Sequence, residues 1–194
     1  MYNKISERRE KMYFEKAGPE NTEETLKIAK EEALKRGIKS IVAASTVGDT
    51  GIKAAKMLKG TGIKLVVVTH NTGFGKEGSQ QFDPQIKKEI EDLGGVVFTG
   101  TMVTRGLGAA IKGKMSFSYE ELVANTLRIL GQGMKVCAEI TAMASDAGLV
   151  PFTDLIAVGG TGRGADTAVV IKANSSNNFF DLKIKEVLAK PKEF

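Results

Sequence analysis

The stretch IVAASTVGDTGIKAAK, residues 41–56, passes from an apolar run through small polar residues into a helix-like segment. Its middle supplies hydroxyls and a glycine for a tight turn at Ser45, Thr46, Gly48, Asp49 and Thr50. Free backbone N–H groups and the helix dipole favour an anion at such a helix start. We therefore interpret the stretch as a phosphate site, with a plain helix start capped by Thr46 or Asp49 as the alternative.

Two further glycine patterns match nucleotide-binding motifs less well. GAAIKGKM, residues 108–115, is close to the Walker pattern, but Met115 stands where a hydroxyl should hold Mg²⁺. GGTGRG, residues 159–164, is close to a dinucleotide fingerprint, but the residues after it are typical of a strand instead of a helix. We interpret GGTGRG as a hairpin tip whose amides and Arg163 hold a phosphate or sugar edge, with a solvent-exposed hairpin as the alternative.

Residues suited to acid–base or metal chemistry are few. His70 is the only histidine, and it directly follows an apolar run, at the expected ligand edge of a sheet. Cys137 lies on the apolar side of an expected helix, which favours a buried, inert thiol. No Cys/His cluster has zinc spacing, so we expect no metal. Phe74 or Phe179 would stack on a planar ligand, with anchoring in the core as the alternative.

The elements that would position these residues alternate along the first half of the chain. Apolar runs without alternation at 40–45, 63–70 and 95–100 predict strands covered on both faces. Helical patterns lie between them, with Asn21 and Glu24 as a capping box and Pro84 at a helix start. Strand–helix alternation implies parallel pairing with right-handed crossovers.

The second half of the chain predicts more helix and then a hairpin. Helices are expected at 105–113, 121–130 and 134–148, the second capped by Ser118 with Glu121. The strands LIAVGG and DTAVVIKA are too close for a parallel crossover, so they should pair antiparallel, with KIKEVLAK as a last strand. The fold class is therefore α/β, a mostly parallel mixed sheet that ends in an antiparallel hairpin, with helices on both faces.

Composition limits the class of protein. The chain has 194 residues, 42% of them hydrophobic and 26% charged, which predicts one domain at 12–194 after an N-terminal extension at 1–11. The net charge of +5 is spread among alternating lysines and glutamates, so we expect a phosphorylated small molecule as partner and no nucleic acid. With one Cys and no apolar run of about 20 residues, a cytoplasmic location without membrane contact is expected. A homo-oligomer remains open.

Two segments resemble the C-terminal domain of pyruvate kinase. IVAASTVGDTGIKAAK followed by IKLVVVTHN is similar to its first phosphate loop, and LIAVGGTGRGADTAVVIKA is similar to its closing strand, loop and strand. In that enzyme both loops hold the phosphates of a sugar-phosphate activator. Asp49 stands where the family often has a basic residue, which disfavours a bisphosphate. The catalytic barrel has no counterpart here, so no pyruvate kinase activity is expected.

A group of stand-alone proteins similar to this domain, from archaea and bacteria, matches more of the chain. Its features recur in Tyr13 to Leu26, Ala44 to Thr50, Thr72 to Phe74, Lys135 to Ala144 and Val158 to Ile171. This resemblance implies a three-layer α/β/α sandwich that binds flavin mononucleotide (FMN). The cofactor-binding residues it implies are Ser45, Thr46, Gly48, Asp49, Thr50, Thr69, His70, Asn71, Thr72, Gly73, Phe74, Gly160, Arg163, Gly164, Ala165, Asp166 and Thr167.

Three functions are compatible with these residues. The first is a binding domain of unassigned role, with the phosphate at Ser45–Thr50 and the rest of the ligand between the THNTGF and GGTGRGAD loops. The second is an FMN-dependent oxidoreductase with His70 or Asp166 near the ring. The third is a regulatory or scaffolding module. Because no acid–base pair is evident, the sequence favours the first and the third, and Asp49 is expected to cap the helix or bind loop amides.

Overall fold

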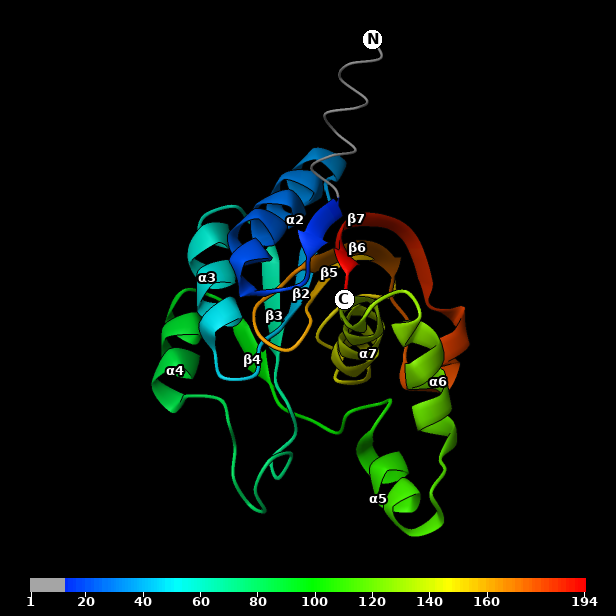
Figure 1. Ribbon diagram of the computed structural model, residues 1–194. Coiled ribbons are helices and arrows are strands. Elements are labelled where there is room, and N and C mark those ends of the chain that lie inside the picture. The colour runs from blue at the N-terminus through cyan, green and yellow to red at the C-terminus, as the bar shows by residue number, and fades with distance from the viewer. Residues whose placement is uncertain (1–12) are drawn as a thin grey trace.

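The computed structural model describes residues 13–194, and the expected N-terminal extension, residues 1–11, lies outside them. The described residues form one sheet in the order β1-β7-β6-β5-β2-β3-β4 (Figure 1). Its strands are β1 (Tyr13–Lys16), β2 (Ser40–Ala44), β3 (Lys64–Val68), β4 (Val96–Phe98), β5 (Asp154–Gly159), β6 (Thr167–Lys172) and β7 (Lys183–Glu193).

The sheet is mixed, as expected. β5, β2, β3 and β4 run parallel to one another, β6 is antiparallel to β5, and β7 is antiparallel to β6. The antiparallel pairing of β5 with β6 confirms the predicted hairpin, whose short connection at 160–166 cannot carry a parallel crossover. β1 adds a parallel edge to β7, a pairing between the two ends of the described chain.

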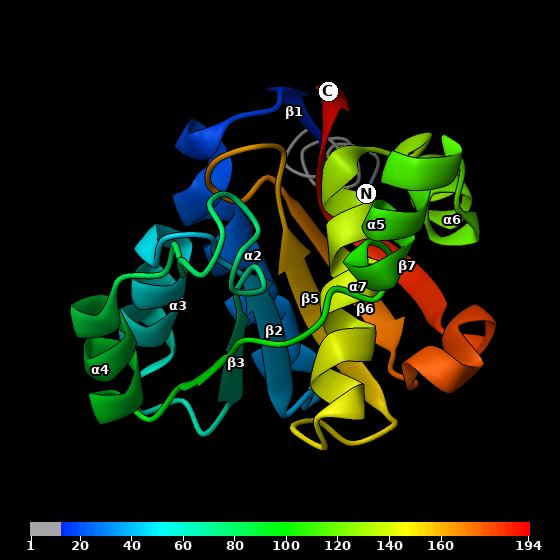
Figure 2. The ribbon, with the colours of Figure 1, turned by 90° about the horizontal axis from the view of Figure 1, so that it is seen from below.

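Helices cover both faces of the sheet (Figure 2). They are α2 (Thr22–Arg36), α3 (Asp49–Leu58), α4 (Pro84–Asp92), α5 (Gly106–Met115), α6 (Tyr119–Arg128) and α7 (Gln132–Asp146), with 3₁₀ turns η1 (Pro19–Asn21) and η2 (Ser176–Asp181). α2, α3 and α4 pack on one face and α7 on the other, while α6 packs on α7 and α5 on α6. This arrangement confirms the three-layer α/β/α sandwich.

The two cores explain why the central strands lack alternation. Successive side chains of a strand point to opposite faces. Ile41 and Ala43 of β2 therefore join the cluster under α2 and α3, whereas Val42 joins the cluster under α7. Since both faces are covered by helices, an apolar residue is favoured at every position.

The helix starts were predicted with mixed success. Ser118 caps α6 by accepting from the Glu121 N–H at 3.2 Å, and Pro84 begins α4, as expected. The Asn21 capping box is wrong, because the side chain of Asn21 makes no cap hydrogen bond to α2. Asn21 ends the 3₁₀ turn η1 in a helical conformation, and its Nδ2 donates to the Lys16 carbonyl at 2.9 Å instead.

Within residues 13–194, no helix combines the length and the apolar character that crossing a bilayer requires.

Candidate functional site

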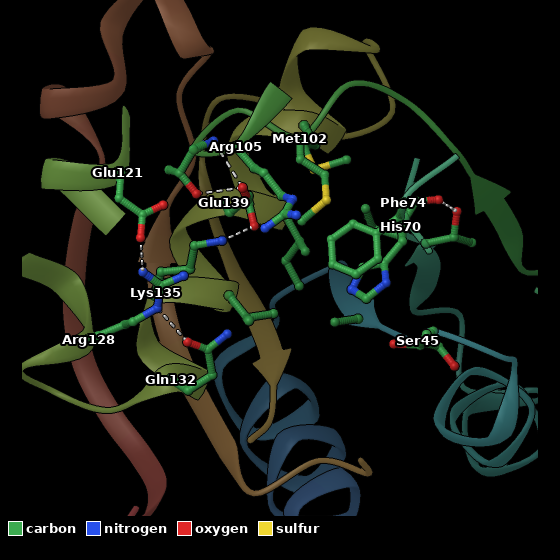
Figure 3. Close-up of a pocket in the computed structure, with 18 residues that line it drawn as sticks. Ser45, His70, Phe74, Met102, Arg105, Glu121, Arg128, Gln132, Lys135 and Glu139 are labelled. Atoms are coloured by element: carbon green, nitrogen blue, oxygen red, sulfur yellow. Dashed lines mark hydrogen bonds and ion pairs between the residues drawn. The ribbon is translucent and has the colours of Figure 1, made fainter. Parts of the chain in front are cut away.

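A cavity of about 240 Å³ opens between the carboxyl ends of β2 and β3 and the helix α7 (Figure 3). Ser45 and Thr46 follow β2 directly, and Thr69 and His70 follow β3, so the parallel strands bring these four residues to one edge. Ligands of open α/β sheets bind at this edge. The opposite wall comes from α6, α7 and the segment before α5, and it combines charged side chains such as Lys135 and Glu139 with apolar ones such as Ile140 and Met143.

The β2–α3 turn has backbone N–H groups available for an anion. The N–H groups of Gly48, Asp49 and Thr50 have no protein acceptor within residues 13–194, whereas the Gly51 N–H donates to Ser45 Oγ at 3.2 Å. A helix start of this kind favours negative charge. Ser45 Oγ is thus already engaged in holding the turn, which leaves the amides to meet a ligand.

Gly48 is required at this turn for two reasons. Its φ of +120° is strained for a residue with a side chain. A Cβ there would also lie 2.6 Å from Cγ2 of Ile86 in α4. The turn is therefore packed against α4 at Gly48, while Ser45 and Thr46 before it line the cavity.

The expectation that Asp49 caps α3 is wrong. Gly48 occupies the cap position without a side-chain cap bond, and Asp49 is the first residue of the helix. The side chain of Asp49 is exposed. The hydroxyl of Ser45 supplies the hydrogen bond that the carboxylate was expected to make, because the strand leads Ser45 under the helix start.

An aromatic pair forms part of the cavity wall. The rings of His70 and Phe74 stack with centroids 3.9 Å apart and planes 27° apart. The guanidinium of Arg105 lies 4.6 Å from the centroid of the Phe74 ring, which is within the range of a cation–π contact. His70 Nδ1 is 3.1 Å from Gln81 Oε1, which fixes the ring. Phe74 thus has the His70 ring stacked on it and the Arg105 guanidinium over its ring.

A second cavity, of about 370 Å³, adjoins the first and shares Phe74 and Arg105 with it. Asn71 and Gly73 line it from the loop after β3, and Gly106 lines it from the start of α5. Arg105 therefore stands between two spaces, and a ligand longer than the first cavity has room to extend past it.

A buried ion pair lies in the α7 wall. Lys135 and Glu139 are 3% and 2% exposed, and Lys135 Nζ donates to Glu139 Oε2. The other carboxylate oxygen accepts from the Thr104 N–H at 2.9 Å and from the Thr104 hydroxyl at 2.5 Å. Burial lowers the pKa of Lys135, and the nearby Arg128 and Arg105 lower it further, while Glu139 raises it.

The remaining charges at the cavity are partly compensated. Arg128 donates from Nε to Gln132 Oε1 at 2.8 Å and lies 3.6 Å from the Glu121 carboxylate. Lys112 lies 3.2 Å from the same carboxylate, and its hydrogen bond lowers the pKa of Glu121. Arg105 has no carboxylate within ion-pair distance among residues 13–194, so it is the cation at this cavity that remains for a ligand.

The 160–167 loop is held by contacts within the protein. Asp166 is fully buried and accepts from the Thr161 N–H at 3.1 Å and from the Thr167 hydroxyl at 2.8 Å. The Ala165 N–H donates to Thr22 Oγ1 at 3.0 Å, which ties the loop to the start of α2. Arg163 is exposed, and no residue of 160–167 lines either of the two cavities.

The structure thus brings some of the predicted residues together and not others. Ser45, Thr46, Thr69, His70 and Phe74 line the first cavity, and Asn71, Gly73 and Phe74 line the second. The predicted residues that line neither cavity are Gly48, Asp49, Thr50, Thr72, Gly160, Arg163, Gly164, Ala165, Asp166 and Thr167. Which of all these contact a ligand stays a prediction.

Sequence reasoning missed the polar wall formed by Thr104, Arg105, Arg128, Lys135 and Glu139. One signal was available, because Lys135 and Glu139 are four residues apart and share a face of a helix whose residues are mostly apolar or small. Charges inside an apolar helix face are rarely buried without a partner. The positions of Thr104 and Arg105 had no comparable signal.

Two negative findings concern the described residues. No group of three or more His, Cys, Asp or Glu that could hold a metal ion occurs in residues 13–194. Cys137 is completely buried, its Sγ donates to the Ala157 carbonyl at 3.4 Å, and burial raises its thiol pKa far above the ordinary value. A thiol in this state is a poor nucleophile.

Comparison with known proteins finds distant likenesses. No family model matches the sequence. Crystal structures of a pyruvate kinase from Cryptosporidium parvum are similar, with TM-scores of 0.41–0.43, 13–14% identity and 79% of this chain covered. The chain spans 22–24% of the length of those enzymes. An O-ureido-L-serine synthase is similar with a TM-score of 0.31, 16% identity and 68% of this chain covered, against 40% of its own.

With TM-scores below 0.5, these likenesses carry no argument about what this chain does. The expected relationship to archaeal and bacterial stand-alone proteins stays a prediction.

Proposed function

We propose that this chain is a binding domain for a phosphorylated small molecule. The phosphate would lie on the β2–α3 turn, and the rest of the ligand would extend through the cavity toward Phe74 and Arg105. The observation that carries the proposal is the set of N–H groups at Gly48, Asp49 and Thr50 that have no protein acceptor within residues 13–194, at the carboxyl edge of a parallel sheet.

Arg105 supports a ligand that carries negative charge. Its guanidinium has a ring beside it and no carboxylate partner among the described residues, so an anionic ligand would meet an uncompensated cation at the mouth of the cavity. A guanidinium is also suited to phosphate, which it binds through two parallel hydrogen bonds.

FMN is the first ligand to test. Its single phosphate suits one helix start, and its flat ring suits the surface offered by His70 and Phe74. The two adjoining cavities, about 240 and 370 Å³, give the ligand space on both sides of Arg105. The proposal assigns binding, without pyruvate kinase activity, and leaves the biochemical role of the bound ligand open.

An FMN-dependent oxidoreductase remains the second candidate, and His70 is the residue that favours it. His70 lines the cavity, whereas Asp166 is buried and hydrogen-bonded within its own loop. A regulatory or scaffolding module would show ligand binding without turnover, so assays with nicotinamide donors would separate these two alternatives.

Mass spectrometry and absorbance of the purified, denatured protein should find a flavin, and titration with FMN and with inorganic phosphate should show binding. Thr46→Glu places a carboxylate at the cavity edge of the turn, so it should weaken phosphate binding at least tenfold. Thr153→Glu is the matched control, because Thr153 is exposed and precedes β5 at the opposite edge of the sheet. Absence of flavin, with no binding of either probe, would overturn the proposal.

A further inference from the structure

The Lys135–Glu139 pair is unusual among the ion pairs of residues 13–194, because it is both buried and at a cavity. Its side chains are 4% and 2% exposed, while the pair Lys88–Asp92 in α4 has the same spacing of four residues with side chains 75% and 64% exposed. The two pairs thus differ in surroundings and not in local geometry. Lys135 and Glu139 both line the first cavity.

Glu139 is held in one orientation. One of its oxygens accepts both hydrogen bonds from Thr104, so the other oxygen is left to the amine of Lys135. Figure 3 shows the amine directed toward this carboxylate, with the guanidinium of Arg105 on the same side of the cavity. A proton acceptor is therefore fixed beside the amine, and cations lie near it.

The surroundings shift the pKa of the buried Lys135 and that of the exposed Lys88 in opposite directions. Burial, with Arg128 and Arg105 nearby, lowers the pKa of Lys135, whereas the hydrogen bond to Asp92 raises the pKa of the exposed Lys88. A lysine removed from water and placed near other cations is activated as a nucleophile, because its neutral amine form costs less to reach than it does in water.

We propose that Lys135 is a reactive amine that forms an imine with a phosphorylated aldehyde or ketone bound in this cavity. The inference rests on the proposed function for the binding of the phosphate at the β2–α3 turn. It differs in the class of ligand, a carbonyl compound in place of a flavin.

The step balances without an added oxidant or reductant. Lys135 gives its proton to Glu139, and the neutral amine adds to the carbonyl carbon to form a carbinolamine. Glu139 returns the proton to the hydroxyl, which leaves as water while the C=N bond forms. The ammonium and the carbonyl compound thus become an iminium and one water, and Glu139 ends as a carboxylate. Thr104 keeps Glu139 in place for both transfers, so it is a positioning residue.

The experiment is reductive trapping. The intact protein is incubated with glyceraldehyde 3-phosphate, reduced with borohydride and digested, and the modified lysines are identified by mass spectrometry. We expect one adduct on Lys135, formed at least tenfold faster than any adduct on Lys88, and slowed by inorganic phosphate. Lys135→Arg keeps the charge next to Glu139 but cannot form an imine, so its adduct should be lost with the circular dichroism spectrum unchanged.

The variant Thr104→Val tests the positioning role. It removes the hydroxyl that donates to Glu139 and keeps the shape of the side chain. Trapping at Lys135 should slow several-fold and shift in its pH profile, while phosphate binding should remain. Unchanged trapping in this variant would overturn the role given to Thr104.

The outcomes separate this inference from the proposed function. Phosphate binding without an adduct on Lys135, or labelling at equal rates on Lys135 and Lys88, overturns the inference and leaves the proposed function standing. If glyceraldehyde and glyceraldehyde 3-phosphate are trapped on Lys135 at equal rates, and Thr46→Glu changes neither rate, the reactive amine is supported and the phosphate site is overturned.

Discussion

Thr104 and Glu139 are joined by two hydrogen bonds to one carboxylate oxygen, from the Thr104 N–H at 2.9 Å and from its hydroxyl at 2.5 Å. The two residues are 35 positions apart in the chain. These bonds attach the segment before α5 to the middle of α7, and they place Arg105, the next residue, at the mouth of the cavity. The same contact therefore stabilises the fold and builds the candidate site.

Glu139→Gln should destabilise the protein strongly. The substitution leaves the ammonium of Lys135 buried without a counter-charge, and breaking a buried pair in this way costs about 3–5 kcal/mol. Urea denaturation followed by circular dichroism measures the free energy of unfolding. Asp92→Asn is the matched control at an exposed pair with the same spacing, where little change is expected. Equal effects of the two substitutions would show that the Lys135–Glu139 pair is not buried as described.

Above neutral pH, the free energy of unfolding of the wild type should rise with pH relative to that of the variant Lys135→Arg. The pKa of Lys135 is lowered in the folded state, so the unfolded chain binds more protons between that pKa and the ordinary lysine value of about 10.4. Where the unfolded state binds more protons, the free energy of unfolding rises with pH. Arginine stays charged in both states and shows no such slope.

This pH dependence is measured as the difference between the two unfolding free energies, in urea, at several pH values from 7 upward to about 10.4. A difference that stays flat, or that falls with pH, would contradict a lowered pKa for Lys135.

Gly48→Ala should destabilise by about 2–3 kcal/mol, because it adds backbone strain and a close contact with Ile86. Gly60→Ala is the control: its φ is +75° and its Cβ would meet nothing within 4 Å, so only the strain of about 1 kcal/mol is expected. Thermal denaturation compares the two variants. In the double variant Gly48→Ala with Ile86→Ala, the loss in free energy of unfolding should be smaller than the sum of the losses in the two single variants. A loss equal to that sum would argue against the contact.

Ser45→Ala and Asp49→Ala should differ in their effects on stability. Ser45 Oγ accepts the Gly51 N–H in a buried position, so its removal should cost about 1–2 kcal/mol. Asp49 is exposed and makes no cap bond, so only its favourable interaction with the helix dipole is lost, about 0.5 kcal/mol. A larger loss for Asp49→Ala than for Ser45→Ala in denaturation curves would contradict these assignments.

Local patterns in the sequence were sufficient to predict most of the architecture. The runs that became β2 and β3 show no alternation, which is the pattern of strands covered by helices on both faces. β5 and β6 are too close in sequence for a parallel crossover, which required the hairpin. Ser118 and Pro84 marked helix starts correctly, since their contacts span only three residues or fewer.

Contacts between distant residues were not predictable in this way. The start of α2 differs from its prediction because a 3₁₀ turn precedes the helix and directs Asn21 toward Lys16. No local pattern indicated that the GGTGRGAD loop is held at its Ala165 amide by Thr22, across 143 positions of the chain. Its buried residues are engaged within the protein, a fact that depends on where η1 and α2 pack.

By itself, the sequence determined the succession of strands and helices along the chain and the mixed sheet, because each depends on neighbouring residues and on hydrophobic periodicity. The turn at Ser45–Thr50 as a place for an anion is a prediction from the same local pattern. Only the tertiary structure decided what faces that turn. The packing of α7 against β2 and β5, and the attachment of Thr104 to Glu139, bring Lys135 and Arg105 to the cavity. Such a wall depends on which helix covers which strand, and this relationship leaves no periodic trace in the chain.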